Sequence, residues 1–255
     1  MALPGSTTMT TPSKRQEGFW ETVRTVVYAI LVALVIRTLM FEPFNIPSGS
    51  MIPTLLVGDY LFVSKFSYGY SKHSFPFSIM PIEGRIFEST PQRGDVVVFK
   101  LPRDNKTDYI KRVIGLPGDT VQMQDGRLFI NGTLVERERV DDFVYRDNTT
   151  GSLLRSLQYK EHLPGGKVHP ILEDGDNRRF DNTSEFKVPE GHVFMMGDNR
   201  DHSLDSRSDV GFVPAENLVG RAEFLFFSTD GTSATWQVWR WPLATRFSRF
   251  FTGIN

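Results

Sequence analysis

The sequence predicts a mainly β fold, in which an N-terminal transmembrane helix precedes an antiparallel β domain that carries an inserted β subdomain. Three observations lead to this prediction. One strongly apolar stretch lies near the N-terminus, and short runs of β-branched and aromatic residues separated by turn residues follow it. A more polar segment, residues 140–186, interrupts these runs. With a hydrophobic content of 40%, the chain can bury a real core, so disorder is not expected.

The apolar stretch is expected to anchor the chain in a membrane. It is uncharged from Thr25 to Ile36, and residues 20–41 together would form about 33 Å of helix, which is enough to cross a bilayer. The alternatives are a cleaved signal peptide and a buried core helix. Residues 38–43 contain no small-x-small cleavage site, and this favours the uncleaved anchor.

The charges around the apolar stretch predict its orientation. Lys14, Arg15 and Arg24 precede it, whereas only Arg37 follows it closely. Basic residues collect on the cytoplasmic side of a membrane, so residues 1–19 are expected to form a cytoplasmic tail and everything from residue 42 onward to lie outside. The protein would therefore cross the cytoplasmic membrane once.

Composition excludes several classes of function. The chain has 29 basic and 30 acidic residues, a net charge of -1, and no overall field that would attract nucleic acid. It has no cysteine, which excludes a thiol nucleophile, disulfides and cysteine metal sites.

The outer part is expected to be one β domain in two parts, residues 42–139 and 187–255, with the inserted subdomain between them. No helix-length amphipathic segments alternate with the strands, so the sheet should be antiparallel, with Greek-key or barrel-like packing. The predicted strands are Tyr60–Phe66, Asp95–Leu101, Tyr109–Leu116, Thr120–Met123, Val193–Met196 and Ala222–Phe227.

An aromatic and basic tail ends the chain. Two interpretations are equally good: the tail lies among lipid headgroups, or it packs against the core as a terminal segment. Its aromatic and basic residues are Trp236, Trp239, Arg240, Trp241, Arg246, Phe247, Arg249, Phe250 and Phe251.

A serine and a lysine are the candidate catalytic pair. Ser50 lies in a hydroxyl-rich turn shortly after the apolar stretch, and none of the five histidines has a sequence context that suggests a base for it. At its ordinary pKa almost none of a lysine amine is neutral at pH 7, so a lysine base must be buried away from water, which lowers the pKa. Lys111 lies in an apolar run, where strand alternation sends it and Arg112 to opposite faces. The alternative is a solvent-exposed lysine on a half-solvated sheet.

Four collinear segments carry a resemblance to a known family. They are Pro47–Leu55 followed by Gly58–Asp59, then Arg93–Phe99, Asp108–Asp119 and Met196–Arg207. Together they resemble the bacterial type I signal peptidases, or leader peptidases, over most of the outer domain. The resemblance implies that Ser50 is the nucleophile and Lys111 the general base.

The resemblance also implies roles for neighbouring residues. The Ser203 hydroxyl would orient the lysine amine, the Ser48 hydroxyl and the Ser50 backbone N–H would form the oxyanion hole, and Asp205 and Arg207 would be a supporting ion pair. Family members cut after small residues at the first and third positions before the bond. Positions matching the walls of those pockets are Phe44, Ile46, Met51, Leu55, Val98, Tyr109 and Ile110; for each of them ordinary core packing is the alternative.

The resulting hypothesis is a Ser-Lys serine endopeptidase on the outer face of the bacterial cytoplasmic membrane. Its partners would be secretory precursors with signal peptides and membrane lipid, with no nucleic acid; it would need no metal and no cofactor, and no oligomeric state follows. Two alternatives remain: a specialised Ser-Lys processing peptidase of pilus or conjugation type, and an anchored β domain that binds without catalysis.

Overall fold

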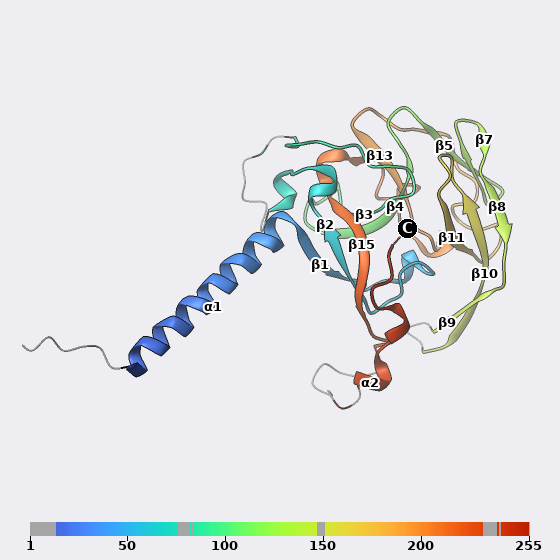
Figure 1. The fold of residues 1–255 in the computed structure, drawn as a ribbon. Coiled ribbons are helices and arrows are strands. Elements are labelled where there is room, and N and C mark those ends of the chain that lie inside the picture. Colours follow the sequence, from blue (N-terminus) through green and yellow to red (C-terminus); the bar gives the residue numbers. More distant parts are fainter. Residues whose placement is uncertain are drawn as a thin grey trace, which may run out of the picture.

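The computed structural model describes residues 14–75, 82, 84–146, 151–231, 239 and 241–254. Within them a long N-terminal helix projects from a β domain (Figure 1). The helix, α1 (Lys14–Leu39), contains a segment, Gly18–Leu39, whose length and mean hydropathy of 1.8 suit a membrane span. None of that segment's apolar window is buried, so α1 is not a core helix.

The boundaries of α1 differ slightly from the predicted anchor. The helix begins at Lys14, inside the predicted tail, and ends at Leu39, so that Phe41 opens the first strand instead of closing the helix. Pro43 explains the early end, because a proline disfavours helical backbone in the residue before it and cannot donate a helix hydrogen bond. Residues 1–13 of the predicted tail lie outside the described residues.

The main sheet has seven strands in the order β1-β2-β15-β3-β4-β13-β14, and each neighbouring pair is antiparallel. Pro43 is tolerated in β1 because β1 is an edge strand. The bounds are β1 Phe41–Asn45, β2 Asp59–Ser64, β3 Val96–Lys100, β4 Asp108–Gly115, β13 His192–Met196, β14 Val213–Pro214 and β15 Leu218–Ser228. The predicted antiparallel, mainly β fold is confirmed.

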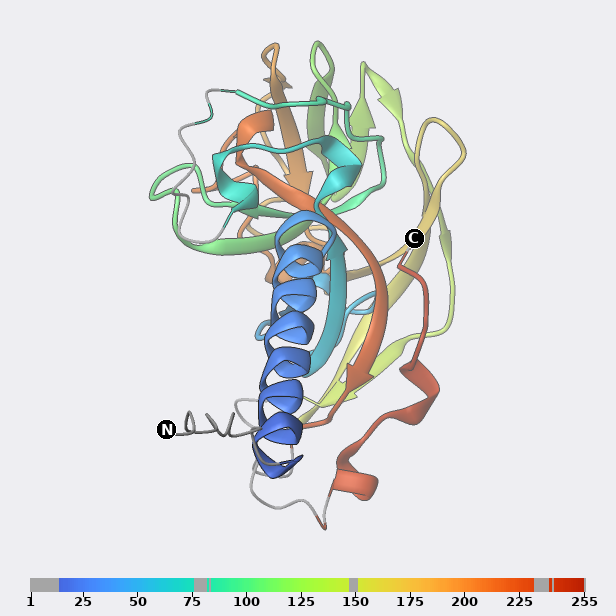
Figure 2. The ribbon, with the colours of Figure 1, turned by 60° about the vertical axis from the view of Figure 1, so that its left-hand side comes forward.

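The longest strand of the main sheet, β15, is curved. Its pairing with β2 shifts register between Ala222 and Phe224 and again between Leu225 and Phe227. Such irregularities bend and twist a strand, and Figure 2 shows β15 arching across the domain. The sheet therefore curls around an apolar core that includes Leu61, Val63 and Val98.

Two smaller sheets complete the domain. One has the order β11-β10-β8, with β9 also paired to β10, and the other has the order β12-β5-β6-β7. Their bounds are β5 Thr120–Gln124, β6 Arg127–Ile130, β7 Thr133–Leu134, β8 Glu136–Arg139, β9 Phe143–Arg146, β10 Leu153–His162, β11 Val168–Glu173 and β12 Phe186–Lys187. The first of these sheets includes β8, which lies before residue 140. Strand β12, at the end of the 140–186 segment, belongs to the second sheet, where it pairs with β5.

The C-terminal segment folds back onto the main domain. After β15 come a short helix, α2 (Trp241–Ala244), and a 3-10 turn, Phe247–Arg249. Arg249 donates to the buried carboxylate of Asp59 at 2.6 Å, while Phe251 and Leu243 are exposed. The tail therefore combines inward-facing cations with outward-facing apolar groups. Residues 232–238 and 240, including Trp236 and Arg240, lie outside the described residues.

Candidate active site

Ser50 and Lys111 meet across two elements that are far apart in sequence. Ser50 lies in a 3-10 turn, η1 (Gly49–Met51), and Lys111 lies on β4. The Lys111 Nζ atom is 2.6 Å from Ser50 Oγ and also donates to the Ile110 carbonyl at 3.0 Å. This is the geometry in which an amine can take a proton from a hydroxyl.

Burial gives Lys111 the property that a base requires. Only 3% of the residue is exposed. The loss of hydration lowers its pKa to about 8, although the negative charges of Asp205 and Asp198 oppose the shift. At such a pKa about a tenth of the amine is neutral at pH 7, compared with well under about a thousandth for an ordinary lysine. The lysine is not the solvent-exposed residue of the alternative interpretation.

Ser203 lies close to the Ser50 backbone because a glycine separates them. It is buried, and a Cβ atom on Gly197 would lie 2.5 Å from the Ser203 Cβ atom and 2.5 Å from the Ser50 carbonyl oxygen. Only glycine permits this approach. Ser203 Oγ makes no hydrogen bond to Lys111 in the described part of the chain.

The ion pair of Asp205 and Arg207 holds the loop that carries Ser203. Arg207 contacts both carboxylate oxygens of Asp205, at 3.0 and 2.9 Å, and donates to the Arg200 carbonyl at 2.6 Å. Asp205 also accepts from the Gly197 backbone N–H at 3.0 Å. Burial opposes ionisation of Asp205, but Arg207 outweighs it and lowers the pKa of that carboxyl. The pair therefore fixes both ends of the loop.

A second buried ion pair lies beneath the Ser50 turn. Arg112 contacts both oxygens of Asp198, at 2.8 and 2.7 Å, and each side chain is 1% exposed. Thr54 donates to Asp198 at 2.5 Å. The next residue, Asn199, donates from its backbone to the Ser50 carbonyl at 3.1 Å and from its side chain to the Gly49 carbonyl at 3.1 Å. These contacts tie the Ser50 turn to β4 and to the segment after β13.

A cleft of about 530 Å³ opens over Ser50 and Lys111. Ser48 is exposed on its wall, and Tyr109 and Ile110 line it beside Lys111. The cleft is also lined from β9, β10 and the Ser203 loop. The lining residues from these segments are Tyr145, Leu154, Asn199, His202 and Leu204.

Comparison with known proteins decides the family. A family model described as "Signal peptidase, peptidase S26" matches residues 19–227. The chain belongs to this peptidase family. Similar curated proteins are the signal peptidase I of Rickettsia typhi, 46% identical over 80% of this chain and 79% of the relative, and that of Rickettsia conorii, 46% identical over 80% and 78%. A solved signal peptidase I from Enterococcus faecalis is 29% identical, covers 52% of this chain and 97% of its own, and has a TM-score of 0.31.

The seven residues matched to signal peptidase pocket walls do not all reach the cleft. Tyr109 and Ile110 line it, whereas Phe44 lines a neighbouring cavity near the end of α1. Met51 and Leu55 are completely buried, and they share one apolar cluster with Ile46 and Val98. None of these four lines the cleft, but Ile110, which does, packs against their cluster.

Sequence reasoning missed several residues of the site. Arg112 and Asp198 were both within segments that carry the family resemblance, but their pairing joins positions far apart in the chain. Tyr145 and Leu154 come from the 140–186 segment, to which no role was assigned. Alternation on β4 was the one available signal, because it placed Arg112 on the face away from Lys111.

Proposed function

We propose that the chain is a membrane-anchored serine endopeptidase that removes signal peptides from exported precursors by means of a Ser50–Lys111 pair. The observation that carries the proposal is the 2.6 Å contact between Ser50 Oγ and a buried lysine amine whose pKa is lowered to about 8. The family assignment supports the reaction class.

The proposed reaction has two stages. Neutral Lys111 takes the Ser50 proton as Oγ attacks the scissile carbonyl, and the protonated lysine then returns a proton to the leaving amine of the mature protein. Water activated by Lys111 hydrolyses the acyl-enzyme and frees the signal peptide. The Ser50 backbone N–H and the Ser48 hydroxyl are proposed to stabilise the oxyanion. The Ser203 hydroxyl is proposed to orient the amine.

The proposed location follows from the anchor. We place the N-terminus in the cytoplasm and the β domain on the outer face of the membrane, with α1 in contact with lipid. The chain from Phe41 to Ser50 spans at most about 32 Å. A precursor whose apolar segment is still in the bilayer therefore presents its cleavage site within reach of Ser50.

The decisive experiment is cleavage of a defined precursor. Detergent-solubilised protein, incubated with a secretory precursor, is expected to release a mature chain that begins directly after an Ala-x-Ala sequence, as N-terminal sequencing would show. Replacing the final alanine with tryptophan should lower cleavage by at least about 10²-fold, because a pocket closed by apolar walls excludes large side chains. Ser50→Ala protein serves as the blank. Cleavage at another consensus would favour the specialised processing peptidase.

The lysine pKa predicts how activity depends on pH. Because only the neutral amine can accept the Ser50 proton, kcat/KM should rise about tenfold per pH unit below pH 8 and level off above it. Initial rates from pH 6 to 10 with a saturating and a dilute peptide substrate would provide this profile. A flat profile from pH 6 to 8, or a rise centred near pH 10, would contradict a desolvated lysine base.

A further inference from the structure

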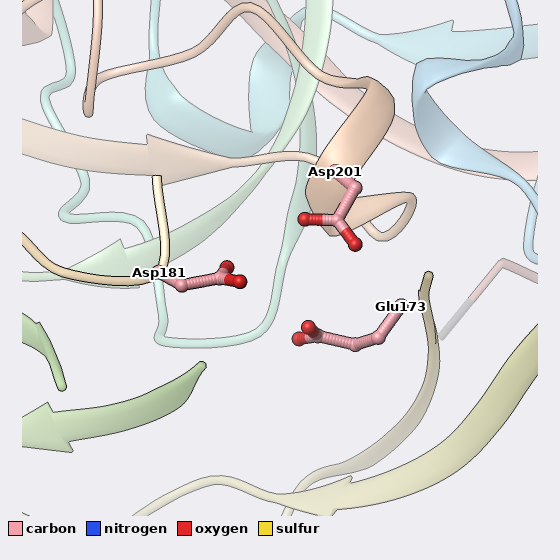
Figure 3. Close-up of side chains that lie close together, drawn as sticks. All are labelled: Glu173, Asp181 and Asp201. Carbon is pink, nitrogen blue, oxygen red and sulfur yellow. The ribbon is translucent and has the colours of Figure 1, made fainter. Parts of the chain in front are cut away.

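Three acidic side chains converge outside the catalytic cleft. Glu173 ends β11, Asp181 lies in the connection from β11 to β12, and Asp201 lies in the 3-10 turn Arg200–His202. Figure 3 shows their carboxyl groups facing one another. One oxygen from each lies within 4.8 Å of the others. Oxygens bound to opposite sides of one Ca²⁺ ion are about 4.6–5.2 Å apart, so this spacing fits a shared cation.

The oxygens that face the shared space lack hydrogen-bond partners. Both oxygens of Glu173, Asp181 Oδ1 and Asp201 Oδ1 are buried and accept no hydrogen bond among the described residues. Glu173 is 1% exposed and Asp181 is completely buried. Unpaired buried carboxylate oxygens are costly, and a bound cation is one of the few groups that satisfies several of them together.

On each aspartate, one carboxylate oxygen accepts a hydrogen bond from the backbone, and this fixes the direction of the other oxygen. The Arg178 N–H donates to Asp181 Oδ2 at 2.5 Å, and the Asp174 N–H donates to Asp201 Oδ2 at 2.6 Å. The remaining oxygen of each aspartate is left to point toward Glu173. The carboxylates are thus oriented by the fold itself.

Two arginines near the cluster, within the described part of the chain, make their shorter contacts to other carboxylates. Arg200 is directed to both oxygens of Glu161, and Arg137, whose Nη1 is 3.4 Å from Glu173, also pairs with Asp176 at 2.8 Å.

The pKa of Glu173 reflects its burial. Burial raises it to about 8, although the attraction of Arg200 and Arg137 opposes the rise; the repulsion of Asp201 and Asp181 adds a smaller contribution.

We infer that Glu173, Asp181 and Asp201 form a binding site for a divalent cation, and that Ca²⁺ suits it better than Mg²⁺. Ca²⁺ takes six to eight oxygen ligands in flexible geometry, so four protein oxygens and water can complete its shell. Opposite ligands of Mg²⁺ are only about 4.2 Å apart, and Mg²⁺ demands a more regular shell. The ion takes no part in peptide cleavage.

The position of the site gives the ion a structural role. Asp201 is two residues before Ser203, so a cation bound there fastens the active-site loop to β11 and to the connection that follows β11. An ion that binds the folded chain raises its stability by mass action. Binding of Ca²⁺ should therefore protect the Ser203 loop from unfolding.

The test compares Ca²⁺ and Mg²⁺ binding to the full, detergent-solubilised chain after removal of metal with EGTA. Isothermal titration with CaCl2 up to about 10 mM covers the range of extracellular calcium sites. We expect saturable binding of one Ca²⁺ per chain, at least about tenfold tighter than Mg²⁺, and a rise in Tm with CaCl2. No heat and no rise in Tm up to that concentration would overturn the inference.

Two variants make the test specific. Asp181→Asn removes the charge of one of the three proposed ligands with little change of shape, and it should weaken Ca²⁺ binding at least about tenfold. Asp141→Asn removes an exposed carboxylate that lies before β9, and it should bind Ca²⁺ as the wild type does. In EGTA the Asp181→Asn protein should be at least as stable as the wild type, because repulsion is relieved, whereas in Ca²⁺ the order should reverse. If both variants lost Ca²⁺ binding equally, or neither did, the assignment of the ligands would be wrong.

Discussion

Replacing Lys111 with arginine is expected to lower kcat/KM for precursor cleavage by at least about 10³-fold. Arginine retains the positive charge but does not deprotonate at neutral pH, so it cannot take the Ser50 proton. The loss should appear in kcat, because the proton is transferred during the reaction and not during binding. Single-turnover cleavage of a precursor, with Tm measured on the same preparation, checks the prediction.

A second buried lysine supplies the matched control. Lys65 is 2% exposed, but it pairs with Glu42 at 2.9 Å and donates to the Ser74 carbonyl at 2.6 Å, so its charge is used structurally. Lys65→Arg should keep activity within about tenfold of the wild type. Near-normal turnover by Lys111→Arg protein would eliminate the lysine-base mechanism, whatever the control shows.

Removing Asp198 is expected to cost about 3–5 kcal/mol of stability, because it leaves the Arg112 guanidinium buried without its bidentate partner. This is a large share of the total stability of an ordinary domain, which is about 5–15 kcal/mol. Urea denaturation of the detergent-solubilised Asp198→Ala chain would measure it. The same change should loosen the Ser50 turn, since Thr54 also donates to Asp198.

An exposed ion pair and a double replacement supply the controls for Asp198→Ala. Glu136 lies 3.9 Å from Arg127 and its side chain is 76% exposed, so Glu136→Ala should cost no more than about 1 kcal/mol. The double replacement Arg112→Met and Asp198→Leu should recover part of the loss, because it removes both charges. A cost for Asp198→Ala as small as that for Glu136→Ala would show that the pair is not an important support of the turn.

Features of the site that depend on neighbouring residues in the sequence could be predicted, whereas contacts between residues far apart in the sequence could not. The alternating apolar pattern around Lys111 predicted its strand and its direction, because a strand encodes its two faces locally. The early end of α1 also has a local cause in Pro43, although the apolar composition through Phe41 concealed it.

Contacts between segments that are far apart in the sequence were harder to predict. The family resemblance, and not the spacing of residues, brought Ser50 and Lys111 together before the fold was known. The pairing of Arg112 with Asp198 depends on how β4 lies beside β13, which the sequence does not state. Glu173, Asp181 and Asp201 have no motif spacing, because the fold assembles them from three separate segments.

The junction between α1 and β1 has a consequence for how substrates are found. Only Met40 separates the two elements, and it is held on both sides: its N–H donates to the Ile36 carbonyl at 2.8 Å, and its carbonyl accepts from the Lys65 N–H at 2.9 Å. These two hydrogen bonds tie the end of α1 directly to the β domain. With α1 in the bilayer as proposed, this short junction keeps the cleft near the membrane surface, so an encounter with a laterally diffusing polypeptide becomes a search in two dimensions.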